Sequence, residues 1–131
     1  MAGSYYTKPV SIATFLAGGA IAANSAVKLS AENTVVVTSA ITDDVIGFAQ
    51  ETVASGDRVN VEMANGAIVK VVCGGTIAAG AQLMPKASGS GQMLTAAGAT
   101  ALSCAIALQG GASGETIAAL TRYSVKTPAN T

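Results

Sequence analysis

The residues that could support catalysis are few and scattered. The 131-residue chain contains no histidine, the commonest general base and metal ligand. Asp43 and Asp44 are adjacent, and adjacent side chains on a strand or turn point apart. Serine and threonine are abundant, but each lysine is isolated, so no base is evident to activate a hydroxyl. The sequence therefore predicts no catalytic residues and no enzyme activity, with Asp43-Asp44 capping a loop or lying on a solvated turn.

The cysteines and paired glycines indicate structural roles. Cys73 and Cys104 each lie in an apolar run and are expected to be buried free thiols, with a disulfide left open. Two cysteines without a CxxC motif make a poor zinc site. Gly74-Gly75 and Gly110-Gly111 lack the context of phosphate-binding loops, so we expect them to form turns. The sequence predicts no metal and no cofactor.

The composition favours a globular chain that packs against other proteins. Hydrophobic residues make up 50% and charged residues 11%, which is too apolar for a disordered chain. The net charge is +0 with scattered basic residues, so no nucleic-acid partner is expected. Residues 9–27 carry no charge, but Gly18-Gly19 interrupts them, so neither a signal peptide nor a membrane partner is expected.

The strongest local pattern is a β-hairpin around Asn65-Gly66. Val59, Val61 and Met63 alternate with polar residues, as in a strand with one apolar face. Asn-Gly tolerates the positive φ of a two-residue hairpin turn, and a β-branched strand follows it. The predicted pairs are Met63 with Ile68, Val61 with Lys70, and Val59 with Val72.

The return strand of this predicted hairpin is apolar on both faces. Strands of this kind are usually covered on both sides. In so small a protein a neighbouring subunit could supply the second cover, and a homotrimer is expected. The predicted subunit interface consists of Val69, Val71 and Cys73. The alternative is a bulge that shifts the register.

An internal repeat is the second major signal. Gly18-Gly19-Ala20-Ile21-Ala22-Ala23 is matched 56 residues later by Gly74-Gly75-Thr76-Ile77-Ala78-Ala79. Two further blocks are matched 58 residues later: Ile46-Gly47-Phe48-Ala49 by Cys104-Ala105-Ile106-Ala107, and Ala54-Ser55-Gly56-Asp57 by Ala112-Ser113-Gly114-Glu115. Three matched blocks in the same order indicate a duplicated unit.

The repeat predicts an all-β fold, because helix signals are poor and one copy alone cannot bury its apolar face. We expect a small β-barrel or β-sandwich built from two tandem pseudo-symmetric repeats, with an extended N-terminal arm. The expected division is an arm at 1–17, a β domain at 18–122 with repeats at about 18–73 and 74–122, and a tail at 123–131. The expected strands are Ala26–Leu29, Thr34–Thr38, Val45–Glu51, Arg58–Ala64, Ala67–Cys73, Gln82–Pro85, Leu102–Leu108 and Thr116–Leu120.

The arm is rich in residues that anchor interfaces. Aromatic side chains bury a large area, and an extended segment can add to a sheet edge. The hypothesis is that the arm contacts a partner protein or a neighbouring subunit, and the alternative is that it forms the first strand of the barrel itself. The predicted contact residues are Tyr5, Tyr6, Pro9, Val10, Ile12 and Phe15.

Two families resemble parts of this sequence. Gly56-Asp57-Arg58-Val59 and residues 77–83 resemble the turns of biotinyl and lipoyl carrier domains, although the expected hairpin tip has no lysine to modify. A carrier-like or other β-rich interaction module stays as an alternative.

The second resemblance covers about residues 18–120. Residues 45–49, 54–61, Gly66 with its following strand, and 77–83 resemble the capsid decoration (cement) proteins of tailed bacteriophages. The resemblance implies a β-rich homotrimer on the outer surface of the virion. Such a protein is made in the host bacterial cytoplasm and ties neighbouring copies of the major capsid protein together.

Overall fold

The computed structural model describes residues 12–88, 90–97 and 102–126. Within these ranges the regular structure consists of strands, and no helix is long and apolar enough to cross a membrane. The strands are β1 (Ile12–Ala17), β2 (Ala26–Ala31), β3 (Thr34–Val37), β4 (Gly47–Ala49), β5 (Arg58–Met63), β6 (Ile68–Val72), β7 (Gln82–Pro85), β8 (Met93–Thr95), β9 (Leu102–Ala107) and β10 (Thr116–Lys126). The prediction of an all-β fold is confirmed.

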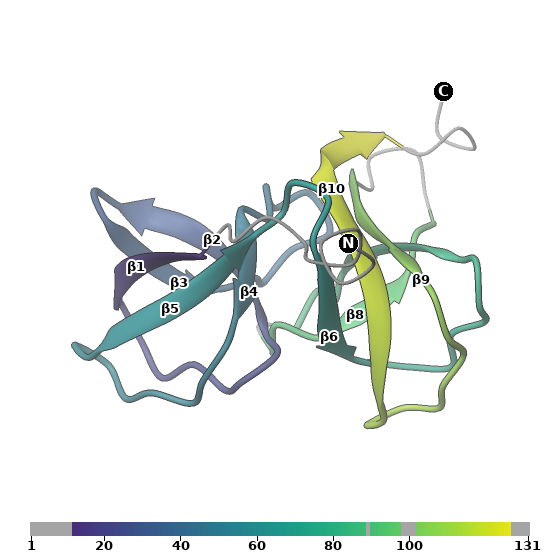
Figure 1. The fold of residues 1–131 in the computed structure, drawn as a ribbon, viewed down its shortest axis with the longest axis horizontal. Helices are drawn as coiled ribbons and strands as arrows, with labels where there is room; N and C mark the ends of the chain where they lie inside the picture. Colours follow the sequence, from purple (N-terminus) through teal and green to yellow (C-terminus); the bar gives the residue numbers. More distant parts are fainter. Residues whose placement is uncertain (1–11, 89, 98–101, 127–131) are drawn as a thin grey trace, which may run out of the picture.

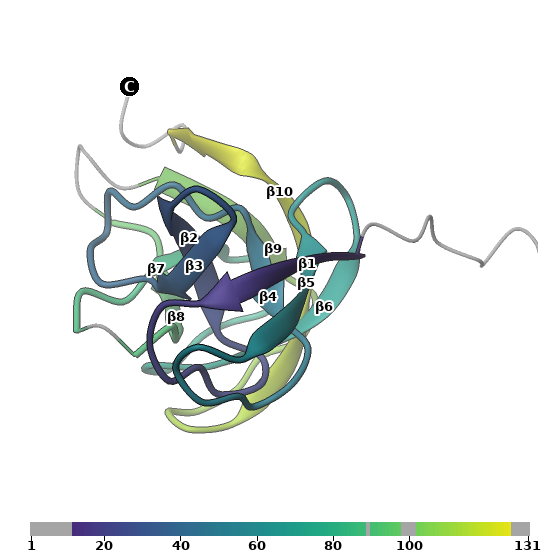
Figure 2. The same ribbon diagram turned by 90° about the vertical axis from the view of Figure 1, so that its left-hand side faces the viewer.

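The strands form two units side by side (Figure 1). The first half, β1 to β5, is a closed barrel in the order β1-β3-β2-β4-β5. The second half, β6 to β10, is a five-stranded sheet in the order β6-β10-β9-β7-β8. A parallel bridge between Cys73 and Met93 brings β6 and β8 together at one end. Figure 2 looks along the molecule from the end formed by the first half.

The two halves repeat the same pairing, residue for residue. Ile12 is opposite Glu62 in the first half, and their equivalents 56 and 58 residues later, Ile68 and Leu120, are opposite each other in the second. The β2–β4 pair Ala26 and Phe48 corresponds in the same way to Gln82 and Ile106. The offsets read from the sequence therefore describe a true structural duplication.

The interiors are also duplicated. The buried core of the first half contains Ala17, Ile21, Val27, Val35, Ala49, Val59 and Val61. All seven equivalents belong to the core of the second half: Cys73, Ile77, Leu83, Met93, Ala107, Ile117 and Ala119. Short side chains at these inward positions suit a small barrel, whose interior is filled by alternate residues of each strand.

The halves differ in one respect, because the core of the second half includes residues of the first. Ala26, Val45 and Phe48 belong to the second core, and Phe48 is the largest fully buried side chain. The Ala26 N–H donates to the Gly91 carbonyl at 2.9 Å. In Figure 1 β4 lies between the halves and next to β6. The second half therefore completes its core by packing on the first.

The predicted hairpin at Asn65-Gly66 is wrong. β5 pairs with β1 and β4, and β6 pairs with β10, so the two strands belong to different sheets. Gly66 does adopt a positive φ of 105°, as the turn prediction requires. The turn connects the two halves, because each flanking strand finds its partner farther away in the sequence.

The expected boundaries also need correction. Residues 12–17 form β1 inside the barrel, so the prediction of an arm over residues 1–17 is wrong for this part, and the alternative of a first barrel strand holds. The duplicated units begin at β1 and β6, not at Gly18 and Gly74. β10 runs to Lys126, so residues 123–126 are strand and not tail. Residues 1–11 and 127–131 lie outside the described part of the chain.

Candidate interaction surface

The predicted partner-contact residues divide into two groups. Tyr5, Tyr6, Pro9 and Val10 lie outside the described residues. Ile12 is exposed on β1, whereas Phe15 is half-buried and packs against the core of the first half. Of the described pair, Ile12 is the more exposed.

The predicted subunit interface is wrong. Val69, Val71 and Cys73 are all buried in the core of their own half. On β6, Ile68 and Lys70 are the exposed residues. The alternation was read correctly, but the opposite face points outward, because β6 pairs with β10 over its whole length and turns its odd-numbered residues inward.

The exposed apolar side chains mark a surface that the sequence prediction missed. Leu120 on β10 is opposite Ile68 on β6, and Ile106 on β9 is opposite Leu120. The exposed fractions of Ile68 and Leu120 are 51% and 37%. The repeat alone does not identify these positions, because they correspond to Ile12, which is exposed, and to Phe48 and Glu62, which are buried. The large apolar residues exposed in the described chain are Ile12, Leu16, Leu29, Ile68, Leu108, Leu120 and Tyr123.

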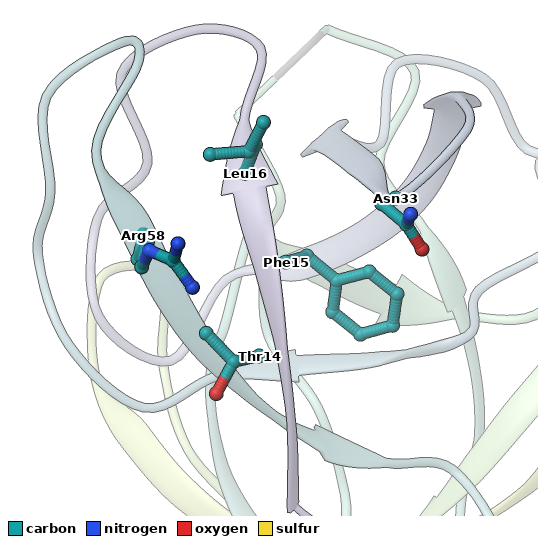
Figure 3. A pocket seen from close by; sticks show the side chains of 5 residues that line it. All are labelled: Thr14, Phe15, Leu16, Asn33 and Arg58. Atoms are coloured by element: carbon teal, nitrogen blue, oxygen red, sulfur yellow. The ribbon is translucent and has the colours of Figure 1, made fainter.

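A hollow of about 300 Å³ opens beside β1 in the first half. It is lined by Thr14, Phe15, Leu16, Asn33 and Arg58. Figure 3 shows the Phe15 ring on the side of β1 that faces Asn33, with Arg58 on the other side of the strand. Asn33 has a positive φ of 55°, and its carbonyl accepts from the Leu16 N–H at 2.8 Å. The hollow combines an apolar floor with amide and guanidinium groups at its rim.

A second hollow, of about 390 Å³, lies where the two halves meet. Its lining includes Asp44 and Met63 from the first half and the exposed Tyr123 from β10. Nearby, the Arg122 guanidinium donates to Gln82 Oε1 at 2.5 Å and to Ser103 Oγ at 2.8 Å. These bonds fix the Arg122 side chain across the outer side of β7, β9 and β10.

The carboxylate pair is structural, as expected. Asp43 Oδ2 accepts from the N–H groups of Ser39 and Ala40 at 2.6 and 2.9 Å, and Oδ1 accepts from Lys28 Nζ at 3.1 Å. Burial alone would raise the pKa of Asp43, but the hydrogen bonds from Ser39, Lys28 and Ala40 hold it below the usual value. Asp43 therefore caps its loop.

Both cysteines are free and buried, as the sequence predicts. Burial raises the pKa of the Cys104 thiol to about 12. Burial, together with the nearby Glu115 carboxylate, also raises the pKa of Cys73. Thiols held in the protonated form are poor nucleophiles. Residues 12–88, 90–97 and 102–126 contain no group of three histidine, cysteine or acidic residues placed to hold a metal ion.

Comparison with known proteins identifies a shared architecture. No family model and no curated protein matches the chain. Among solved structures, the chain is similar to the N base of the head fiber gp8.5 of bacteriophage phi29, with a TM-score of 0.67 and 17% sequence identity. The match covers 88% of this chain and 98% of that chain. This likeness shows that both chains share one fold of two joined β units.

Proposed function

We propose that this chain is a structural protein of a bacteriophage head. It binds the outer surface of the capsid as a decoration (cement) protein and stabilises contacts between major capsid proteins. It acts as a homotrimer and has no catalytic activity. It is made in the cytoplasm of the host bacterium and becomes part of the virion.

The observation that carries this proposal is the fold likeness to a head fiber base, which spans nearly the whole of both chains. Its support is increased by an independent resemblance of the turn and strand motifs to decoration proteins. The exposed apolar residues on β1, β6 and β10 supply the kind of surface that a partner protein would cover. Many copies on one shell would gain further from multivalency.

The carrier alternative has no comparable support. Its lysine would have to project from a hairpin tip, and the segment between β5 and β6 is Ala64-Asn65-Gly66-Ala67. In addition, β5 and β6 pair with other strands and not with each other. A mass spectrum of the expressed protein is a direct check, because biotin or lipoate on Lys28, Lys70 or Lys86 would favour the carrier role.

The proposed function is tested with heads that lack this protein. Purified protein is mixed with such heads, and the bound fraction is measured by co-sedimentation. We expect saturable binding and a higher melting temperature for the decorated heads, since a ligand stabilises the state that it binds. Heads that neither bind the protein nor change in stability would refute the proposal.

A further inference from the structure

The two halves carry equivalent rows of residues on their outer faces. In the first half the row runs across β2, β4 and β5 through Ala26, Phe48 and Glu62, whose exposed fractions are 0%, 0% and 3%. In the second half the equivalent positions are Gln82, Ile106 and Leu120, and none of them is buried. We call this second set, together with Ile68 opposite Leu120, the open row.

The first row is buried because it packs on the second half. Ala26 donates its N–H to the Gly91 carbonyl at 2.9 Å, and Ser25 lies against Gly91 so closely that a Cβ there would clash. Phe48 joins the core that contains Val71. The receiving site of the second half therefore includes Gly91, which Ala26 and Ser25 contact, and the core to which Val71 belongs.

The first half has a related receiving site, and it is open. It differs at the central position, because Asn33 carries the side chain that Gly91 lacks. The equivalents of Gly91 and Val71 are Asn33 and Phe15, and both line the 300 Å³ hollow beside β1. Asn33 and Gly91 share the left-handed conformation, with φ of 55° and 69°. Figure 1 places β1 and β3 at one end of the molecule and β9 toward the other. Among the described residues, one chain thus has an open receiving site at one end and a solvent-exposed docking row toward the other.

We propose that these two surfaces bind each other between copies of this chain, so that the open row of one copy packs into the Phe15–Asn33 hollow of the next. The contact uses the surfaces equivalent to those that join the two halves within one molecule, with the partner set farther from the backbone at Asn33 than Ser25 is at Gly91. The contact is heterologous, which means that each partner contributes a different surface. When such contacts close into a ring, every copy has both its open row and its hollow occupied. This inference rests on the proposed homotrimer and assigns its interface: three copies in a ring give a cycle of six β units.

The test uses three charge substitutions at exposed positions, where a charge should not prevent the single chain from folding. Leu120→Lys places in the open row a charge that the Arg58 guanidinium at the hollow would repel, and unlike glutamate it does not reproduce the equivalent residue Glu62. Leu16→Glu places a charge at the hollow itself. Leu29→Glu is the matched control, because Leu29 is as exposed (53%) but belongs to neither surface. A charge desolvated in an apolar contact is costly, so we expect the first two to weaken assembly about tenfold or more and the control to leave it unchanged. Circular dichroism verifies the fold of each variant.

Mixing the two defective variants distinguishes this contact from a symmetric one. The Leu16→Glu chain keeps its row and the Leu120→Lys chain keeps its hollow, so an equimolar mixture retains one working contact. Sedimentation velocity should show each variant as a monomer alone and a 1:1 heterodimer in the mixture, with no larger species.

Three results would overturn the inference: a monomeric wild-type protein, a folded Leu16→Glu or Leu120→Lys variant that assembles like the wild type, or a mixture that forms no heterodimer at concentrations where the wild type assembles. The proposed function fails separately, through loss of binding to heads. A monomer that decorates heads would refute the interface and leave that function standing.

Discussion

The two halves have the same strand pairings and matching inner cores, yet they differ at the outer row. The first half has Ala26 and Phe48 there, both fully buried against the second half. The second half has Gln82 and Ile106 at these positions, beside Arg122 and its hydrogen bonds. The comparison teaches that inward residues specify the fold of each unit, whereas the outer row specifies what each unit binds.

The largest test of this difference is Phe48→Ala. Removing a fully buried aromatic side chain leaves a cavity, so we expect a loss of about 3–5 kcal/mol in the free energy of unfolding. The matched change, Ile106→Ala, removes a partly exposed side chain and should cost only about 1 kcal/mol. Urea unfolding of both variants, at a concentration where the chain is monomeric, measures the two losses. Equal losses would show that the outer rows are not distinct.

A second test concerns the closeness of β4 and β5 in the first half. A Cβ on Gly47 would clash with the Glu62 backbone and with Val61, whereas the equivalent residue of the second half is Ala105. We expect Gly47→Ala to cost about 1–3 kcal/mol through overpacking. The reverse change, Ala105→Gly, should cost about 1 kcal/mol through backbone entropy. Thermal unfolding measures the loss of stability in each variant. A Gly47→Ala variant as stable as the wild type would mean that β4 and β5 can move apart with no loss of stability.

A third, smaller effect depends on pH. Lys28 forms an ion pair with Asp43 in the first half, whereas the residue equivalent to Lys28 in the second half is the buried Met84. Because the pKa of Asp43 is lowered on folding, its carboxylate stabilises the native state above the unfolded-state pKa. That contribution is lost as the pH falls through the folded-state pKa. We expect Asp43→Asn to cost about 1 kcal/mol at neutral pH and progressively less as the pH falls through the lowered pKa of Asp43. A pH-independent difference would contradict this assignment.

The smallest effect is expected from Cys73→Ala, which gives the second core the residue that the first core has at Ala17. Losing one buried sulfur should cost about 1 kcal/mol or less. Denaturant titration of the reduced protein measures it. A loss of several kcal/mol would show that the two interiors are not interchangeable at this position.

Part of this fold is readable from the sequence. Matched turn motifs such as Ala54-Ser55-Gly56-Asp57 and Ala112-Ser113-Gly114-Glu115 identify the duplication, because both turns need a glycine with positive φ. In each turn the N–H of the alanine also donates to the acidic side chain. The glycine and the acidic residue are both required within the four-residue turn itself, so the turn can be recognised from its own sequence.

The predictions that were wrong concern features that depend on contacts between residues far apart in the sequence. Asn65-Gly66 can form a turn whether or not the strands on either side of it pair with each other. Here β5 pairs with β1, and β6 pairs with β10. Alternation along β6 separates two faces but does not say which one points inward. β8 has only three residues after a glycine-rich loop, so it was missed. The surfaces that we assign to binding emerge only when the equivalent residues of the two halves are compared in space.

The shared core also sets an order of events during synthesis. The core of the first half draws only on residues up to Met63, the last residue of β5, so it can form as soon as β5 has left the ribosome. The second core needs Phe48 from the finished first half as well as Ala119 near the end of the chain. The amino-terminal half therefore acts as a template on which its duplicate folds.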